Sequence, residues 1–101
     1  MIRICLQRTE NTYRFDASGH ADFNPGNDIV CAAVSCLTYT LAKRLSEIGC
    51  KIPSGVLGWG SASFSFSNNI RTREILKTVK CGFEGLSEVY PDNVKLEVFD
   101  I

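Results

Sequence analysis

Several residue types that direct a chain toward particular functions are scarce in this sequence. It contains one histidine, one methionine and one tryptophan among 101 residues, and its 11 basic side chains balance 11 acidic ones. Proteins that bind nucleic acid through its phosphates usually carry an excess of positive charge, so direct nucleic-acid binding is not expected. The sequence likewise lacks the cluster of basic residues that binds anionic membranes.

Long apolar runs are also missing. No stretch approaches the ~20 apolar residues of a membrane-spanning helix, and no signal core of ~7–15 apolar residues follows Met1. We therefore expect a cytoplasmic protein with no membrane association. A chain of 11.2 kDa that is 45% hydrophobic has room for one packed core, which predicts a single domain over residues 1–101.

The five cysteines are odd in number, and no two of them form a Cys-x-x-Cys pair. Disulfide frameworks prefer even counts, and a structural zinc site needs about four convergent ligands. The expectation is therefore free thiols, no metal and no organic cofactor. We interpret Cys5, Cys36, Cys50 and Cys81 as structural residues, which leaves Cys31 for closer analysis.

The hydrophobic pattern predicts four strands and two helices. Alternation with a period of two indicates strands at 2–7, 13–18, 56–67 and 94–99, and steps of three and four indicate helices at about 29–48 and 71–89. This β-β-α-β-α-β order favours an α+β two-layer sandwich, in which two helices cover one face of a mostly antiparallel four-stranded sheet. We expect a homodimer through the exposed sheet face or the apolar first helix.

Punctuating residues support these boundaries. Residues 19–27 are rich in glycine, proline and asparagine and predict a loop. Asp28 follows this loop and is predicted to cap the first helix, which Gly49 ends. Trp59, between two glycines, is interpreted as a core aromatic or as part of a docking surface.

One pair of residues suggests chemistry. His20 lies in the loop, and Cys31 takes the third position of the helix that Asp28 caps. Unpaired N–H groups and the positive end of the helix dipole favour a thiolate there, and a nearby imidazole can take and return a proton. Ser35 lies one turn further along the same helix face. The pattern alone also fits the simpler interpretation, in which His20 is a solvated loop residue and Cys31 is a core residue.

Two sequence segments resemble the ribosomal-processing cysteine protease family (Prp). They are GHA at 19–21 and GNDIVCAAVS at 26–35, and GLSEVYPDNVKL at 85–96 is similar to the closing helix and strand of the family. The resemblance implies a homodimeric cysteine endopeptidase with a catalytic dyad at His20 and Cys31, supported by Asp28 and Ser35. It also implies a substrate, the N-terminal extension of a large-subunit ribosomal protein, which is cut after an aromatic residue.

The predicted mechanism begins with attack of the Cys31 thiolate on the scissile carbonyl, followed by protonation of the leaving amine by His20. Backbone N–H groups of the first helical turn are the expected oxyanion donors, and Asp22 or Asp28 is expected to orient His20. One alternative is a ribosome-assembly factor that binds the same ribosomal-protein segment without cutting it, through Trp59 and the serine-lined strand. Another is a redox sensor that pairs Cys31 with Cys36, which helical geometry disfavours.

Overall fold

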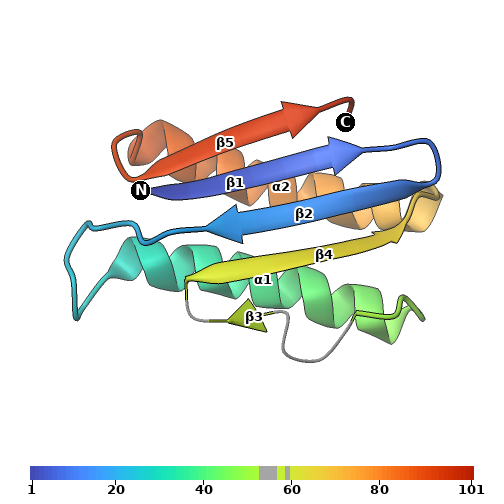
Figure 1. Cartoon of the computed structure of the whole chain (residues 1–101), viewed down its shortest axis with the longest axis horizontal. Coiled ribbons are helices and arrows are strands. Elements are labelled where there is room, and N and C mark those ends of the chain that lie inside the picture. Colours follow the sequence, from blue (N-terminus) through green and yellow to red (C-terminus); the bar gives the residue numbers. More distant parts are fainter. Residues whose placement is uncertain (53–56, 59) are drawn as a thin grey trace.

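The computed structural model of the protein describes residues 1–52, 57–58 and 60–101, with backbone only at 57–58 (Figure 1). The elements follow one another as β1 (Ile2–Arg8), β2 (Thr12–Ser18), α1 (Ile29–Glu47), β3 (Leu57–Gly58), β4 (Ser61–Ser67), α2 (Ile70–Val89) and β5 (Val94–Phe99). Both helices lie on the same face of the sheet (Figure 1).

The strands form one sheet in the order β3-β4-β2-β1-β5. All neighbouring strands are antiparallel except β1 and β5, which run parallel because α2 carries the chain across the sheet between β4 and β5. The α+β two-layer architecture, the mostly antiparallel sheet and the placement of two helices on one face are therefore confirmed. The sheet has one strand more than the four expected, the two-residue β3.

The extra strand arises at Gly60, where the prediction of a single strand over 56–67 was wrong. Gly60 has a φ of +73°, a left-handed conformation that glycine adopts without a steric penalty. The chain turns there, so that Leu57 and Gly58 pair antiparallel with Ala62 and Ser61. The alternating pattern concealed this turn because Gly60 falls in phase with the apolar positions of β4. Residues 53–56 and Trp59, with the interpretation of its role, lie outside the described residues.

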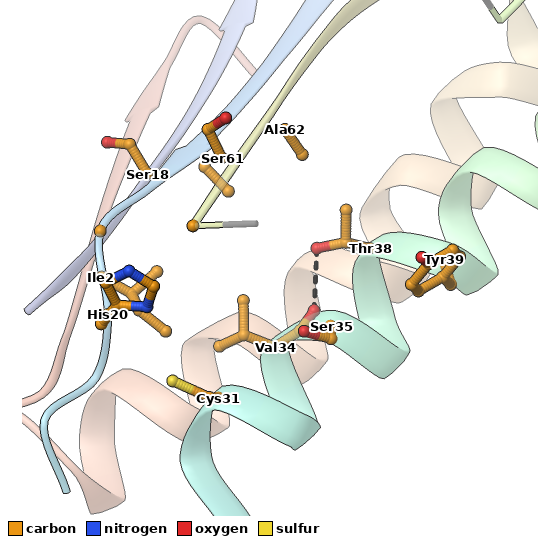
Figure 2. A pocket seen from close by; sticks show the side chains of 13 residues that line it. Ile2, Ser18, His20, Cys31, Val34, Ser35, Thr38, Tyr39, Ser61 and Ala62 are labelled. Carbon is orange, nitrogen blue, oxygen red and sulfur yellow. Dashed lines mark hydrogen bonds between the residues drawn. The ribbon is translucent and has the colours of Figure 1, made fainter. Parts of the chain in front are cut away.

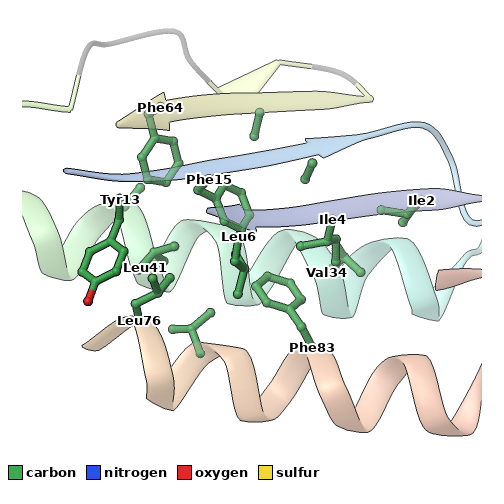
Figure 3. Close-up of a cluster of buried hydrophobic side chains, with 14 of the residues drawn as sticks. Ile2, Ile4, Leu6, Tyr13, Phe15, Val34, Leu41, Phe64, Leu76 and Phe83 are labelled. Carbon is green, nitrogen blue, oxygen red and sulfur yellow. The ribbon is translucent and has the colours of Figure 1, made fainter. Parts of the chain in front are cut away.

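The core fills the space between the sheet and the helices (Figure 3). Phe15 of β2 is fully buried, with ring centroids 5.2 Å from Phe64 of β4 and 5.8 Å from Phe83 of α2. These contacts join both layers of the sandwich. Alternate strand residues face this core, as the period of two predicted, and the serines of β4 are exposed on the opposite face.

Helix α1 lies against both the sheet and α2. By length and composition alone it is a candidate membrane span, which the sequence analysis did not expect. Within the structure 33% of its apolar window is buried. Six of its residues are buried, and five of these are among the apolar residues of the core.

Candidate active site

The first turn of α1 is fixed by Asp28, as predicted. The Asp28 side chain accepts hydrogen bonds from the backbone N–H groups of Val30 and Cys31, both at 3.0 Å. The Asp28 carbonyl accepts a further bond from the N–H of Ala32 at 3.1 Å. These bonds satisfy donors that a helix start leaves unpaired, and they set the position of Cys31.

Asp28 also holds the loop that precedes α1. Its second carboxylate oxygen accepts hydrogen bonds from the backbone N–H groups of Phe23 at 3.0 Å and Asn24 at 3.3 Å. Desolvation alone would raise the pKa of the Asp28 carboxyl, but the four backbone N–H donors stabilise the carboxylate and lower this pKa below its ordinary 3.8. Asp28 therefore ties the loop and the helix together through a charged group.

The end of β2 directs His20 toward this helix. Gly19 has a φ of +94°, and a Cβ atom at this position would collide with the backbone carbonyl of Met1. The Gly19 N–H donates to the Gly60 carbonyl at 2.9 Å, which continues the pairing between β2 and β4 beyond Ser18 and Ser61. His20, the next residue, is exposed and leaves the sheet on the side of α1 (Figure 2).

His20, Cys31 and Ser35 line one cavity of about 280 Å³ (Figure 2). The end of β2 forms one wall, the start of β4 forms another, and α1 forms the third. The apolar part of the lining comes from Ile2, Ala17, Val34 and Ala62. The polar groups at the rim include Ser18 and Ser61. The structure thus brings together three of the four residues predicted for the site around a space that is open to solvent.

The Cys31 sulfur receives a hydrogen-bond donor within the site. The backbone N–H of Ala21 donates to Cys31 Sγ over 3.3 Å, and the Cys31 side chain is half-buried. Ala21 itself is buried, and its carbonyl accepts a hydrogen bond of 2.8 Å from the Asn93 side chain. This bond ties the Cys31 sulfur to the peptide that directly follows His20.

Three of the N–H groups expected to bind an oxyanion already have a partner. The N–H groups of Val30, Cys31 and Ala32 are all bound to Asp28, so the prediction that the first helical turn supplies free donors was wrong for these three residues. The N–H groups that Asp28 binds when it fixes the position of Cys31 are the same groups that were expected to bind an oxyanion. Asp28 therefore contributes by fixing the start of α1, and it is not among the residues that line the cavity.

Two of the four remaining cysteines are more exposed than a structural role predicts. Cys5 and Cys50 are half-buried, but Cys36 and Cys81 are exposed on the surfaces of α1 and α2. Burial raises the pKa of the Cys5 thiol, and the carboxylates of Asp16 and Glu97 raise it further. Among the described residues no group of three or more histidine, cysteine or acidic side chains is arranged to hold a metal ion.

Sequence reasoning missed two residues next to the site, Asn93 and Gly60. Asn93 precedes β5 and is remote in sequence from Ala21, so its hydrogen bond depends on the β1–β5 pairing, which no local pattern reveals. Gly60 was assigned to a strand interior. Its position between Trp59 and a serine gave a signal, because an isolated glycine in a strand pattern often marks a close backbone approach.

Comparisons with known proteins give a family match and several structures of similar fold. The model of a family described as cysteine protease Prp matches residues 1–95. A structure of the ribosomal processing protease Prp from S. aureus with a covalently linked product peptide has a TM-score of 0.71 and 22% identity, over 97% of this chain and 99% of that one. The protein SMU.848 from Streptococcus mutans has a TM-score of 0.75 and 22% identity, over 98% and 94% of the two chains.

A second S. aureus Prp structure, with a substrate peptide, has a TM-score of 0.72 and 21% identity, over 97% of this chain and 99% of that one. At these identities the structures establish a shared fold. No match was found among curated proteins.

Proposed function

The chain belongs to the cysteine protease Prp family, and from this premise we propose an endopeptidase in which Cys31 is the nucleophile and His20 the proton carrier. The observation that carries the assignment is the shared cavity, which His20 and Cys31 line from different elements. The N–H of Ala21, directed at Cys31 Sγ, adds a fixed donor beside the nucleophile.

The reaction proceeds by acyl transfer. His20 holds the Cys31 proton as imidazolium, and the thiolate sulfur forms a bond to the scissile carbonyl carbon. Collapse of the tetrahedral intermediate breaks the carbon–nitrogen bond, and His20 gives its proton to the leaving amine. His20 then takes a proton from water as the water oxygen bonds to the thioester carbon. Cleavage of the carbon–sulfur bond restores the Cys31 thiolate beside the His20 imidazolium, and the released carboxylic acid loses its proton to solvent.

The proposed substrate is a peptide segment of a ribosomal protein. The S. aureus relatives are ribosomal processing proteases with substrate and product peptides bound. In this chain, Ile2, Ala17, Val34 and Ala62 give the cavity an apolar lining, which suits an apolar or aromatic side chain next to the scissile bond. We assign the N-terminal extension of a large-subunit ribosomal protein as the segment that is cut.

The test uses a synthetic peptide that spans the N-terminus of the ribosomal protein from the same organism, with products identified by mass spectrometry. We expect cleavage by the wild type, none by Cys31→Ala, and a loss of about 10²–10⁴-fold with His20→Ala. Cys36→Ala is the matched control, because Cys36 is an exposed thiol on the same helix. Cleavage by Cys31→Ala at the wild-type rate would refute the assignment. Binding without cleavage by the wild type would favour the assembly-factor alternative.

A homodimer in the cytoplasm also forms part of this proposal. The exposed face of α1 supports pairing, because no charged residue occurs between Ile29 and Ala42. Ile29 and Tyr39 on this helix are 57% and 59% exposed. Pairing through α1 would cover them.

A further inference from the structure

Gly60 makes a close approach to the imidazole of His20. A Cβ atom placed on Gly60 would lie 2.9 Å from Nε2 and 3.0 Å from Cε1 of His20. Carbon atoms do not approach a ring this closely without displacement, since both distances lie inside van der Waals contact. The imidazole thus occupies space that any side chain at position 60 would need.

The sheet holds the two residues in this relation. Ser18 of β2 is opposite Ser61 of β4, and the Gly19 N–H donates to the Gly60 carbonyl at 2.9 Å. Gly60 is therefore in register with the residue before His20, and it also lines the cavity that contains Cys31. The backbone of Gly60 forms the surface against which the His20 ring rests.

We infer that Gly60 is a positioning residue for His20, whose missing side chain lets the imidazole take its place beside Cys31. This inference rests on the proposed dyad. A side chain at position 60 displaces the ring from the position it takes in the structure, and proton transfer is sensitive to such displacement. Misplacement of a catalytic group by about 1 Å can cost about 10²-fold in rate.

The left-handed φ of Gly60 is a second reason for glycine, so the test has to separate ring displacement from backbone strain. Gly49 supplies the control, because its φ of +97° is also left-handed and a Cβ atom there would meet nothing within 4 Å. Gly49→Ala carries the strain alone, whereas Gly60→Ala carries the strain and the collision with His20.

The kinetic experiment compares kcat and KM of both variants on the ribosomal-protein peptide. We expect Gly60→Ala to lower kcat by about 10²-fold with little change in KM, and Gly49→Ala to leave both unchanged. Wild-type kcat in Gly60→Ala, together with an inactive His20→Ala, would overturn the role of Gly60 and leave the dyad standing. Full activity in His20→Ala would instead overturn the proposed function.

A spectroscopic readout makes the inference independent of activity. His20 is the only histidine, so its Cε1 proton gives a single NMR resonance that reports the surroundings of the ring. We expect its chemical shift to change in Gly60→Ala and to remain that of the wild type in Gly49→Ala. An unmoved resonance in folded Gly60→Ala would overturn the inference, whatever the cleavage rate.

If Gly60→Ala fails to fold, D-alanine at position 60 provides the second variant. A D-residue accepts a positive φ, and its methyl group points to the other side of the backbone. The chain can be assembled from three synthetic segments joined at Cys50 and Cys81. We expect the D-alanine protein to fold and to keep the wild-type His20 resonance. A displaced His20 resonance in the D-alanine protein would overturn the inference, because its methyl group points away from the imidazole.

Discussion

Thr72 holds the junction between β4 and α2, and its replacement by valine provides a quantitative test of the fold. Thr72 is fully buried, and its hydroxyl donates to the carbonyl of Ser67 at 2.7 Å while accepting from the N–H of Asn69 at 3.0 Å. Asn69 returns a bond from its side chain to the Thr72 N–H at 3.0 Å. The Thr72→Val substitution keeps the shape of the side chain and removes these two hydroxyl bonds, together with the alternative, longer donation of the same proton to the Asn69 carbonyl at 3.1 Å.

The expected loss of stability follows from these bonds. A neutral hydrogen bond contributes about 0.5–1.5 kcal/mol net, so the loss of two predicts a decrease of about 1–3 kcal/mol in the free energy of unfolding. Each kcal/mol corresponds to about 4–8 °C in the melting temperature of a domain of this size. Helix propensity adds little, because threonine and valine have similar values.

Thr78→Val is the matched control on the same helix. Thr78 is exposed, and its hydroxyl makes one bond of 2.8 Å to the carbonyl of Glu74, which water can replace. Urea unfolding followed by circular dichroism gives the free energy for both variants and for the wild type. Equal changes in the two variants, or a change below about 0.5 kcal/mol in Thr72→Val, would refute the reasoning.

Two further predictions concern the loop that joins His20 to α1. The lowered pKa of Asp28 means that its carboxylate stabilises the folded state above pH 3.8, and this contribution is lost as the pH falls through the folded-state pKa. In urea titrations between pH 7 and pH 2.5, Asp28→Asn should therefore be less stable than the wild type at neutral pH, with a difference that shrinks in acid; a constant difference would contradict the assignment. Asn93→Ala should lower kcat about tenfold, because the Ala21 carbonyl loses its partner and the N–H of Ala21 shifts from Cys31 Sγ. Asn27→Ala, in an exposed part of the loop, should cleave at the wild-type rate.

Most of the fold was predictable because local patterns determine it. The alternation in Ile2, Ile4 and Leu6 follows directly from which face of β1 is buried, and Asp28 has the residue type and position of a helix cap. The turn at Gly60 was not predictable from alternation, since a glycine is compatible with either face of a strand. The parallel pairing of β1 with β5 was also inaccessible, because it joins the two ends of the sequence.

The candidate site was predictable in its residues and less so in its contacts. His20 and Cys31 stand out from the sequence as the only histidine and a helix-start cysteine, and the fold places both on one cavity. The Asp28 cap was predicted, but its conflict with an oxyanion role for the same N–H groups was not. The capping preference of aspartate predicts those bonds, but the same donors had also been assigned to an oxyanion.

The place of β1 between β2 and β5 has a consequence for the stage of synthesis at which the candidate site can form. β1 is made first, yet its parallel neighbour β5 is made last, with Ile2 pairing opposite Val94. Asn93, which fixes the Ala21 peptide beside Cys31, precedes that final strand directly. During synthesis from the N-terminus, His20 and Cys31 emerge early, but the wall behind them is complete only after β5 has left the ribosome and docked. For the proposed endopeptidase, the order of the strands therefore postpones completion of the candidate site until β5 has paired with β1.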